Sequence, residues 1–288
     1  MLRTPDIDVL AIGETLIDFI STEPANSLRE VTTFRRYLGG SPTNIAVNLA
    51  KLGKHAAIMS KVGVGAFGRF LHDELVEHGV NTEYLILDPN VNTTFVFVAK
   101  TSGTPDFEPS RNGDYKLTPS EVPDEAIERA KIVHASTWAI SEAPCRSAVR
   151  KAFHMATEQH KSISFDPNYS PIFWPGGDEA MEVMADFFRY TTITKASLDD
   201  ASRLFGKGKK PEEYIEILHQ LGPETVVFTM GKDGSMVSKD GHILAQIPAR
   251  PVDVVDATGA GDAFWAGFLA ALLDEQPLER CLLFARGA

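Results

Sequence analysis

Apolar stretches alternate with amphipathic segments along much of the chain. The stretch Ile7–Ile12 is mostly apolar, as expected for a strand of a parallel sheet that is covered on both faces. Ile45, Leu49 and Leu52 are spaced for one face of a helix that ends at Gly53. Similar patterns predict strands at 56–62, 93–100, 132–136 and 225–229, and helices at 70–78, 147–160, 199–205, 263–273 and 277–285. This alternation predicts a doubly wound α/β fold, in which helices cover both faces of a mostly parallel sheet.

Two stretches depart from this alternation. Residues 20–37 are polar and mixed and show no helical period. Residues 93–100 are β-branched and aromatic, which is typical of a strand, and the polar stretch 107–115 follows them. We interpret these stretches as a small β lid, formed by about 19–37 and 91–116, on a single α/β domain that spans 1–288.

Composition and charge limit the classes of partner. The 288 residues carry a net charge of −11, which argues against a nucleic-acid or anionic membrane surface. The two cysteines, Cys145 and Cys281, have no metal-binding or disulfide spacing. No basic, apolar leader opens the chain, and the apolar run 263–273 is too short to cross a bilayer. We therefore expect a cytoplasmic protein without a nucleic-acid or membrane partner.

An acidic, glycine-rich segment leads directly into that apolar run. Residues 256–262 read Asp-Ala-Thr-Gly-Ala-Gly-Asp. The N–H groups of Gly259, Ala260 and Gly261 would lie at a helix start, where unpaired N–H groups and the helix dipole form an anion site suited to phosphate. Asp262 lies at the mouth of that site and could act as a general base for a hydroxyl that attacks phosphorus. A turn of small residues with an acidic helix start is the alternative explanation.

Polar residues near the first strand indicate a second part of the same site. Asp18 follows that strand, and ligands of open α/β sheets bind beyond the carboxyl ends of the strands. Its carboxylate could accept hydrogen bonds from two ligand hydroxyls, or Asp18 could form a turn or cap a helix. Gly39 and Gly40 allow the backbone to approach a substrate, and Asn44 offers a donor and an acceptor to a hydroxyl. Asn44 could equally be a polar residue at a helix start.

Two of these segments together resemble motifs of the ribokinase-like (PfkB) carbohydrate kinase family. They are Asp-Ala-Thr-Gly-Ala-Gly-Asp-Ala-Phe from residue 256 and Gly-Gly-Ser-Pro-Thr-Asn from residue 39. Their order and separation are those of the family, and the resemblance extends from about Val9 to the end of the chain. It implies a ribokinase-like fold and ATP-dependent phosphorylation of a sugar hydroxyl, with Asp18 and Asn44 in contact with the sugar. Ser41 stands where ribose-specific members have Lys, and the chain is most similar to the bacterial fructokinase-like branch.

The resemblance also implies nucleotide-binding positions. Thr229, Gly231 and Gly234 match the family's Thr-x-Gly-x-x-Gly turn. Thr258, in the glycine-rich segment, and Lys195 are assigned to the nucleotide with them. ATP is therefore the expected phosphoryl donor.

Two carboxylates match the family's cation-binding positions. Asp200 corresponds to an acid that meets the Mg²⁺ shell, often through water, although Ser197 and Asp200 also fit a helix-capping pattern. Asp256 matches an acid that binds a monovalent cation, such as K⁺, in many members. Relatives continue beyond the position of Ala288 with a segment that lines the adenine pocket and completes the cation loop, so the resemblance leaves the adenine pocket and the effect of K⁺ open.

One arginine fits the family's pattern and another is replaced. Arg111 and Asp114 match an Arg-to-acid pattern of fructokinase-like members. Arg111 could reach the substrate or the transferred phosphate and close the site against water, or it could be a solvated surface residue. Ser170 stands where these members have the Arg of Asp-Pro-Asn-x-Arg. Either Lys195 or Arg111 then supplies the missing positive charge, or turnover is reduced.

We therefore predict a sugar kinase that uses ATP and Mg²⁺, with fructose as the substrate. The alternatives are a 2-keto-3-deoxygluconate kinase and a catalytically weak sugar-binding or regulatory protein. A homodimer that forms through the lid is a further expectation from the family.

Overall fold

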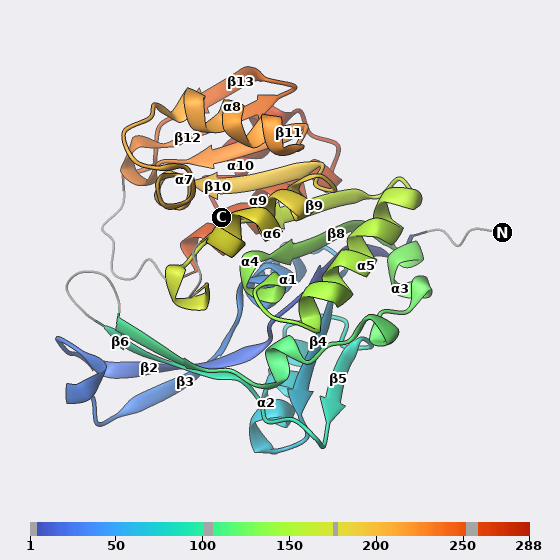
Figure 1. Cartoon of the computed structure of the whole chain (residues 1–288), viewed down its shortest axis with the longest axis vertical. Coiled ribbons are helices and arrows are strands. Elements are labelled where there is room, and N and C mark those ends of the chain that lie inside the picture. The colour runs from blue at the N-terminus through green and yellow to red at the C-terminus, as the bar shows by residue number, and fades with distance from the viewer. Residues whose placement is uncertain (1–4, 101–105, 175–177, 252–258) are drawn as a thin grey trace.

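A computed structural model of the chain describes residues 5–100, 106–174, 178–251 and 259–288. A nine-stranded sheet runs through the larger part of the molecule (Figure 1), and it is parallel except at one edge, where the β11–β12 and β12–β13 pairs are antiparallel. In spatial order its strands are β13 (His242–Ile247), β12 (Ser235–Lys239), β11 (Thr225–Thr229), β10 (Ile193–Ser197), β9 (Ser162–Asp166), β8 (Ala130–Ser136), β1 (Ile7–Ile12), β4 (Ala56–Gly63) and β5 (Leu85–Asp88).

Successive residues of the central strands face opposite layers of the core. In β1, Leu10 and Ile12 belong to one buried cluster, whereas Val9 and Ala11 belong to the other. A strand that is buried on both faces needs apolar residues at nearly every position, which explains its continuous apolar pattern. The helices packed on the first cluster are α3 (Asp124–Arg129), α4 (Thr137–Ile140), α5 (Cys145–Glu158), α6 (Asp178–Phe188), α7 (Leu198–Phe205) and α8 (Pro211–Leu221). Those on the second are α1 (Ser41–Lys51), α2 (Ala66–Glu77), α9 (Ala260–Leu273) and α10 (Leu278–Ala285).

A separate sheet of four strands projects from one side of the large sheet (Figure 1). Its order is β3 (Phe34–Gly39), β2 (Leu16–Pro24), β6 (Phe95–Lys100) and β7 (Asp106–Ser110), and only the β2–β6 pair is parallel among the strands described. The register places Asp18 opposite Tyr37 on β3 and Val96 on β6, so these three residues share one face. Phe19 lies on the other face, where its ring stacks on that of Phe97 with centroids 5.3 Å apart. The small sheet therefore has one face that carries Asp18 and one aromatic face.

The fold class predicted from the sequence is confirmed: a mostly parallel sheet with helices on both faces, and a small second sheet. Some boundaries differ. The helix expected from residue 70 begins at Ala66, because the glycine-rich stretch after β4 is partly helical. A Cβ at Gly68 would lie 1.7 Å from the carbonyl oxygen of Gly63, so this glycine allows close packing. In the described part of the chain, no helix combines the length and the apolar character that a membrane span requires.

Candidate active site

The N-terminus of α9 forms the centre of the candidate site. Gly259 caps the helix with φ of 74°, a left-handed conformation that favours glycine. Ala260 and Gly261 follow as exposed residues, and the first N–H groups of a helix have no intrahelical partners. Asp262 is the next residue and is only 9% exposed. The structure thus brings together a nearly buried carboxylate and a helix N-terminus that is open to an anion.

The carboxylate of Asp262 is held by the first turn of α1. The hydroxyl of Ser41 donates to Oδ1 at 2.8 Å, and the side-chain amide of Asn44 donates to Oδ2 at 2.8 Å. Burial raises the pKa of Asp262, while the positive charge of Lys195 and these two hydrogen bonds oppose the increase. The two motifs that are far apart in the sequence therefore meet at a single carboxylate.

Asp18 lies on β2 near that carboxylate. Burial, and to a lesser extent the negative charge of Asp262, raise the pKa of Asp18 to about 7. The two glycines of the first motif pack tightly here. A Cβ at Gly39 would lie 2.2 Å from Oδ2 of Asp18, and one at Gly40, which has φ of 104°, would lie 2.4 Å from the carbonyl oxygen of Glu14. Both glycines are thus required for Asp18 and α1 to approach each other.

A buried ion pair lies on the other side of α9. Nζ of Lys195, on β10, is 2.7 Å from Oδ2 of Asp166, on the neighbouring strand β9. A Cβ at Gly261 would lie 3.2 Å from the same Nζ, so this ammonium group faces the start of α9. The negative charges of Asp166, Asp200 and Asp262 raise the pKa of Lys195 against the effect of burial. Lys195 thus carries a positive charge beside the anion site.

Asp200 caps α7. Its Oδ2 accepts hydrogen bonds from the backbone N–H of Ser197 at 3.1 Å and from the Ser197 hydroxyl, and its Oδ1 accepts from the N–H of Tyr169 at 2.9 Å. The capping interpretation is therefore observed. Oδ2 uses both of its lone pairs in these bonds, but Oδ1 accepts only one hydrogen bond and retains a lone pair, so a water-mediated contact with a cation is compatible with the cap.

The predicted nucleotide turn follows β11. Thr229 ends that strand, and Gly231 adopts φ of 56° with open space where a Cβ would be. Gly234 has a packing role, because a Cβ there would lie 2.0 Å from the carbonyl oxygen of Ile247 on β13. Thr258 and Asp256 lie outside the residues that the structure describes.

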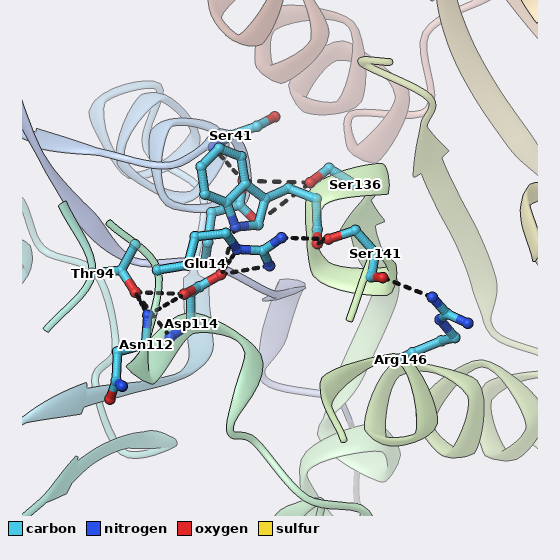
Figure 2. A network of polar contacts seen from close by, with 10 residues as sticks. Glu14, Ser41, Thr94, Asn112, Asp114, Ser136, Ser141 and Arg146 are labelled. Carbon is cyan, nitrogen blue, oxygen red and sulfur yellow. Dashed lines mark hydrogen bonds and ion pairs between the residues drawn. The ribbon is translucent and has the colours of Figure 1, made fainter. Parts of the chain in front are cut away.

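Arg111 is held in a buried polar network that includes Asp114 and Ser141, both labelled in Figure 2. Its Nε and Nη2 lie 2.8 and 2.7 Å from Oδ2 of Asp114, and its Nη1 donates to the Ser141 hydroxyl at 2.7 Å. The indole N–H of Trp138 donates to the same carboxylate oxygen, and the hydroxyl of Thr94 donates to the other. Arg111 is therefore not a free surface arginine. In this conformation its guanidinium holds the segment after β7 against α4.

Three residues of the site were not assigned a contact from the sequence. Glu14 accepts the backbone N–H of Ser41 at 3.0 Å, Ser41 holds Asp262, and Asp166 pairs with Lys195. Burial raises the pKa of Glu14 to about 8. Each residue follows or ends an apolar strand or starts a helix, and that position is the signal that could have identified them.

A cavity of about 770 Å³ opens beside these residues. Asp18, Asn44 and Gly259 line one part of it, and it continues between β3 and the outer sides of α1 and α2. Basic side chains predominate in the far part: Arg35, Arg36, Lys51, His78 and Lys100, beside Glu74. The cavity thus joins Asp18 to the N-terminus of α9 and has room for a small polar molecule.

Known proteins resemble this chain over nearly its whole length. Residues 6–288 match the family described as "pfkB family carbohydrate kinase". The ATP-dependent 6-phosphofructokinase of Thermoanaerobacterium thermosaccharolyticum is 38% identical over 275 residues, which cover 96% of this chain and 84% of that protein. The fructokinase structure of Halothermothrix orenii has a TM-score of 0.85 at 39% identity, covering 98% of this chain and 97% of that one.

A structure of the sugar kinase PH1459 from Pyrococcus horikoshii in complex with ATP has a TM-score of 0.87 at 29% identity, covering 96% of this chain and 89% of that one. The family match spans nearly the whole chain, and both motifs lie at the site described above. This chain belongs to the pfkB family and is a carbohydrate kinase.

Proposed function

We propose that this sugar kinase transfers the γ-phosphoryl group of ATP to a hydroxyl of fructose. The observation that carries the proposal is the Asp262 carboxylate, which Ser41 and Asn44 hold at 2.8 Å beside the open N-terminus of α9. The fructokinase from Halothermothrix orenii supports the choice of sugar, and the ATP complex of the Pyrococcus horikoshii kinase supports the choice of donor.

Asp262 is the proposed general base. It takes the proton of the attacking hydroxyl, and such a base typically contributes ~10²–10⁴-fold to the rate. The N–H groups of Gly259, Ala260 and Gly261 stabilise the negative charge on the transferred phosphoryl group, and each such donor is typically worth about 3 kcal/mol. Both groups belong to the same helix start, which fixes the base relative to the anion site.

Residues of the cavity wall orient the sugar in this proposal. Asp18 accepts hydrogen bonds from two hydroxyls, and Asn44 exchanges part of its contact with Asp262 for the sugar. Gly39 and Gly40 are proposed to let the backbone approach the substrate, in addition to the close packing on Asp18 and Glu14 that they allow. Arg111 can touch the substrate only if its Nη1 gives up the hydrogen bond to the Ser141 hydroxyl and donates to the sugar or the phosphate instead.

The nucleotide is assigned to the other end of the site. Thr229, Gly231 and Gly234 form its turn, Thr258 joins them, and Lys195 neutralises phosphate charge in place of the arginine that Ser170 replaces. Mg²⁺, when bound with ATP, neutralises charge on the phosphates.

The described residues would hold Mg²⁺ through its water ligands and not by direct coordination. They contain no cluster of three or more His, Cys, Asp or Glu side chains placed to hold a metal ion. The oxygens of Asp200 already accept protein hydrogen bonds, which suits a contact through water, because Mg²⁺ holds its waters tightly. Asp256 is the proposed ligand of a monovalent cation.

A second candidate substrate is an anionic sugar. Arg35, Lys51 and Lys100 line the far part of the cavity, where they would pair with a phosphate or carboxylate group. The 6-phosphofructokinase of Thermoanaerobacterium thermosaccharolyticum supports fructose 6-phosphate as this alternative. A carboxylate at the same place would suit 2-keto-3-deoxygluconate.

ADP release measured with Mg-ATP separates these candidates. The panel contains fructose, fructose 6-phosphate, 2-keto-3-deoxygluconate and ribose. Turnover that is highest with fructose supports the proposal, and preference for either anionic sugar replaces fructose with the second candidate. Absence of turnover with a sugar that still raises the melting temperature would instead support a sugar-binding or regulatory protein.

We also infer a homodimer that forms through the small sheet. Phe19, Phe95 and Phe97 pack edge-to-face or stacked on its aromatic face, where they are only partly buried within one chain. A second sheet placed on this face would remove that apolar area from water. Light scattering on the chain and on a Phe97→Glu variant tests this: the variant is expected to be monomeric, and a monomeric parent chain would exclude the dimer.

A further inference from the structure

The first turn of α1 holds both oxygens of the proposed base, but its two donors differ in position. Asn44 lines the cavity, whereas Ser41 is 7% exposed and is not among the described residues that line it. A donor in the cavity wall is available to the substrate, and a donor behind the carboxylate is not. We propose that Ser41 is a positioning residue that holds Asp262 throughout the reaction, and that Glu14 fixes Ser41 in turn. This inference rests on the proposed function only in naming Asp262 as the base.

Glu14 holds the start of α1 at two points. Its Oε1 accepts the backbone N–H of Ser41 at 3.0 Å, and its carbonyl oxygen accepts the hydroxyl of Thr43 at 2.9 Å. The Glu14 side chain is 2% exposed, and the Ser136 hydroxyl lies 3.5 Å from both of its carboxyl oxygens. Figure 2 shows Ser41, Glu14 and Ser136 in this arrangement. The position of the Ser41 hydroxyl is therefore set by a buried side chain and not by solvent.

The Ser41 hydroxyl affects Asp262 in two ways. It restricts rotation of the carboxylate, so that the lone pairs not used by Ser41 and Asn44 keep one direction. It also stabilises the ionised form of a buried carboxylate, the form that accepts a proton. The charged and titratable groups that face Asp262 are Lys195 on β10, Asp18 on β2 and Asp166 on β9. Lys195 favours the ionised form and the two aspartates oppose it, so loss of the Ser41 hydrogen bond shifts Asp262 towards the protonated form.

The test compares Ser41→Ala with Ser136→Ala. Both variants remove one buried hydroxyl next to Glu14, but only Ser41 touches Asp262. In Ser41→Ala, kcat near neutral pH is expected to fall about tenfold, and the acid limb of the kcat profile to move up by about one pH unit. The KM for the sugar should change less than twofold, because Ser41 lies behind the carboxylate. Ser136→Ala should retain the acid limb of the parent enzyme. An unchanged acid limb in Ser41→Ala, or an equal shift in both variants, would overturn the proposal.

Two further measurements do not depend on turnover. In ¹³C NMR of aspartate-labelled protein, the Asp262 signal, assigned by its loss in Asp262→Asn, should titrate at higher pH in Ser41→Ala than in the parent. A crystal structure of the unmutated chain with bound sugar should retain the bond from Ser41 Oγ to Asp262 Oδ1. A parent-like titration, or loss of that bond, would overturn the role of Ser41. Absence of kinase activity together with the expected titration would reject the proposed function alone.

Discussion

Lys195 and Asp166 form an ion pair across two neighbouring strands, with Nζ and Oδ2 2.7 Å apart and both side chains almost fully buried. A charge that is taken out of water needs a partner of opposite sign. Here the partner of Asp166 is Lys195, which also faces the start of α9: a Cβ at Gly261 would lie 3.2 Å from its ammonium group. A single cation therefore compensates a core carboxylate and lies beside the anion site.

Lys195→Met is expected to destabilise the protein by about 3–5 kcal/mol, because Asp166 then remains buried without a partner of opposite charge. The measurement is the free energy of unfolding in urea. Lys131→Met provides the control, since Lys131 pairs with Asp8 but is half exposed, and such a pair is worth about 0–1 kcal/mol. Similar losses in the two variants would contradict the importance of burial for the Lys195 pair.

Asp262→Asn is expected to lower kcat by ~10²–10⁴-fold, because the amide cannot take the proton of the attacking hydroxyl. The amide still accepts a hydrogen bond from Ser41 through its oxygen, and its NH2 group can donate to the side-chain oxygen of Asn44 once the Asn44 amide turns over, so the KM for the sugar should change little. Steady-state kinetics with fructose and Mg-ATP measure both parameters. A variant that binds the sugar normally and keeps full kcat would remove Asp262 from the role of base.

Sugar affinity is expected to rise between about pH 6 and pH 8. The pKa of Asp18 is raised to about 7, so its carboxyl group is largely protonated below that pH. Only the ionised form accepts hydrogen bonds from two sugar hydroxyls, and therefore binding strengthens as pH rises through 7. Calorimetric titration with fructose in the absence of ATP measures this. Asp18→Asn should bind more weakly and with little pH dependence, and a pH-dependent affinity that persists in this variant would assign the effect to another group.

Glu14→Gln should stabilise the protein at alkaline pH. The pKa of Glu14 is raised to about 8 in the folded protein, above the ordinary value of 4.5 for a glutamate side chain. The folded state therefore holds this proton more tightly than the unfolded state, and stability is lost as pH rises from about 4.5 to about 8. The loss approaches about 1.4 kcal/mol per pH unit within that window. Glutamine keeps the acceptor for the Ser41 N–H and does not ionise.

Melting temperatures of the Glu14→Gln variant and the parent chain between pH 5 and pH 8 test this expectation. The two should agree near pH 5, and the variant should be more stable at pH 8. Parallel loss of stability in both proteins would show that other groups determine the pH dependence.

The sequence predicted those features that depend on local pattern. The apolar run of β1 and the glycine-rich start of α9 are found where the pattern placed them. The hydrogen-bond partners of the site residues could not be predicted from local pattern, because contacts such as that of Ser41 with Asp262 join residues that are 221 positions apart. Arg111 shows the same limit: its sequence pattern indicates a ligand contact, but only the fold reveals how Asp114 and Ser141 hold its guanidinium.

Helix α9 carries the proposed base at its first turn, and its next turns, with Trp265 and Phe268, belong to the hydrophobic core. The core packing of α9 thus anchors the proposed base. Asp18 and the basic residues Arg35 and Lys100 belong instead to the projecting small sheet. In the proposed mechanism, phosphoryl transfer therefore depends on α9, whereas Asp18, Arg35 and Lys100, which are assigned to the acceptor, lie on the small sheet. Directed evolution towards a new acceptor could vary β2, β3 and β6 and leave α9 untouched.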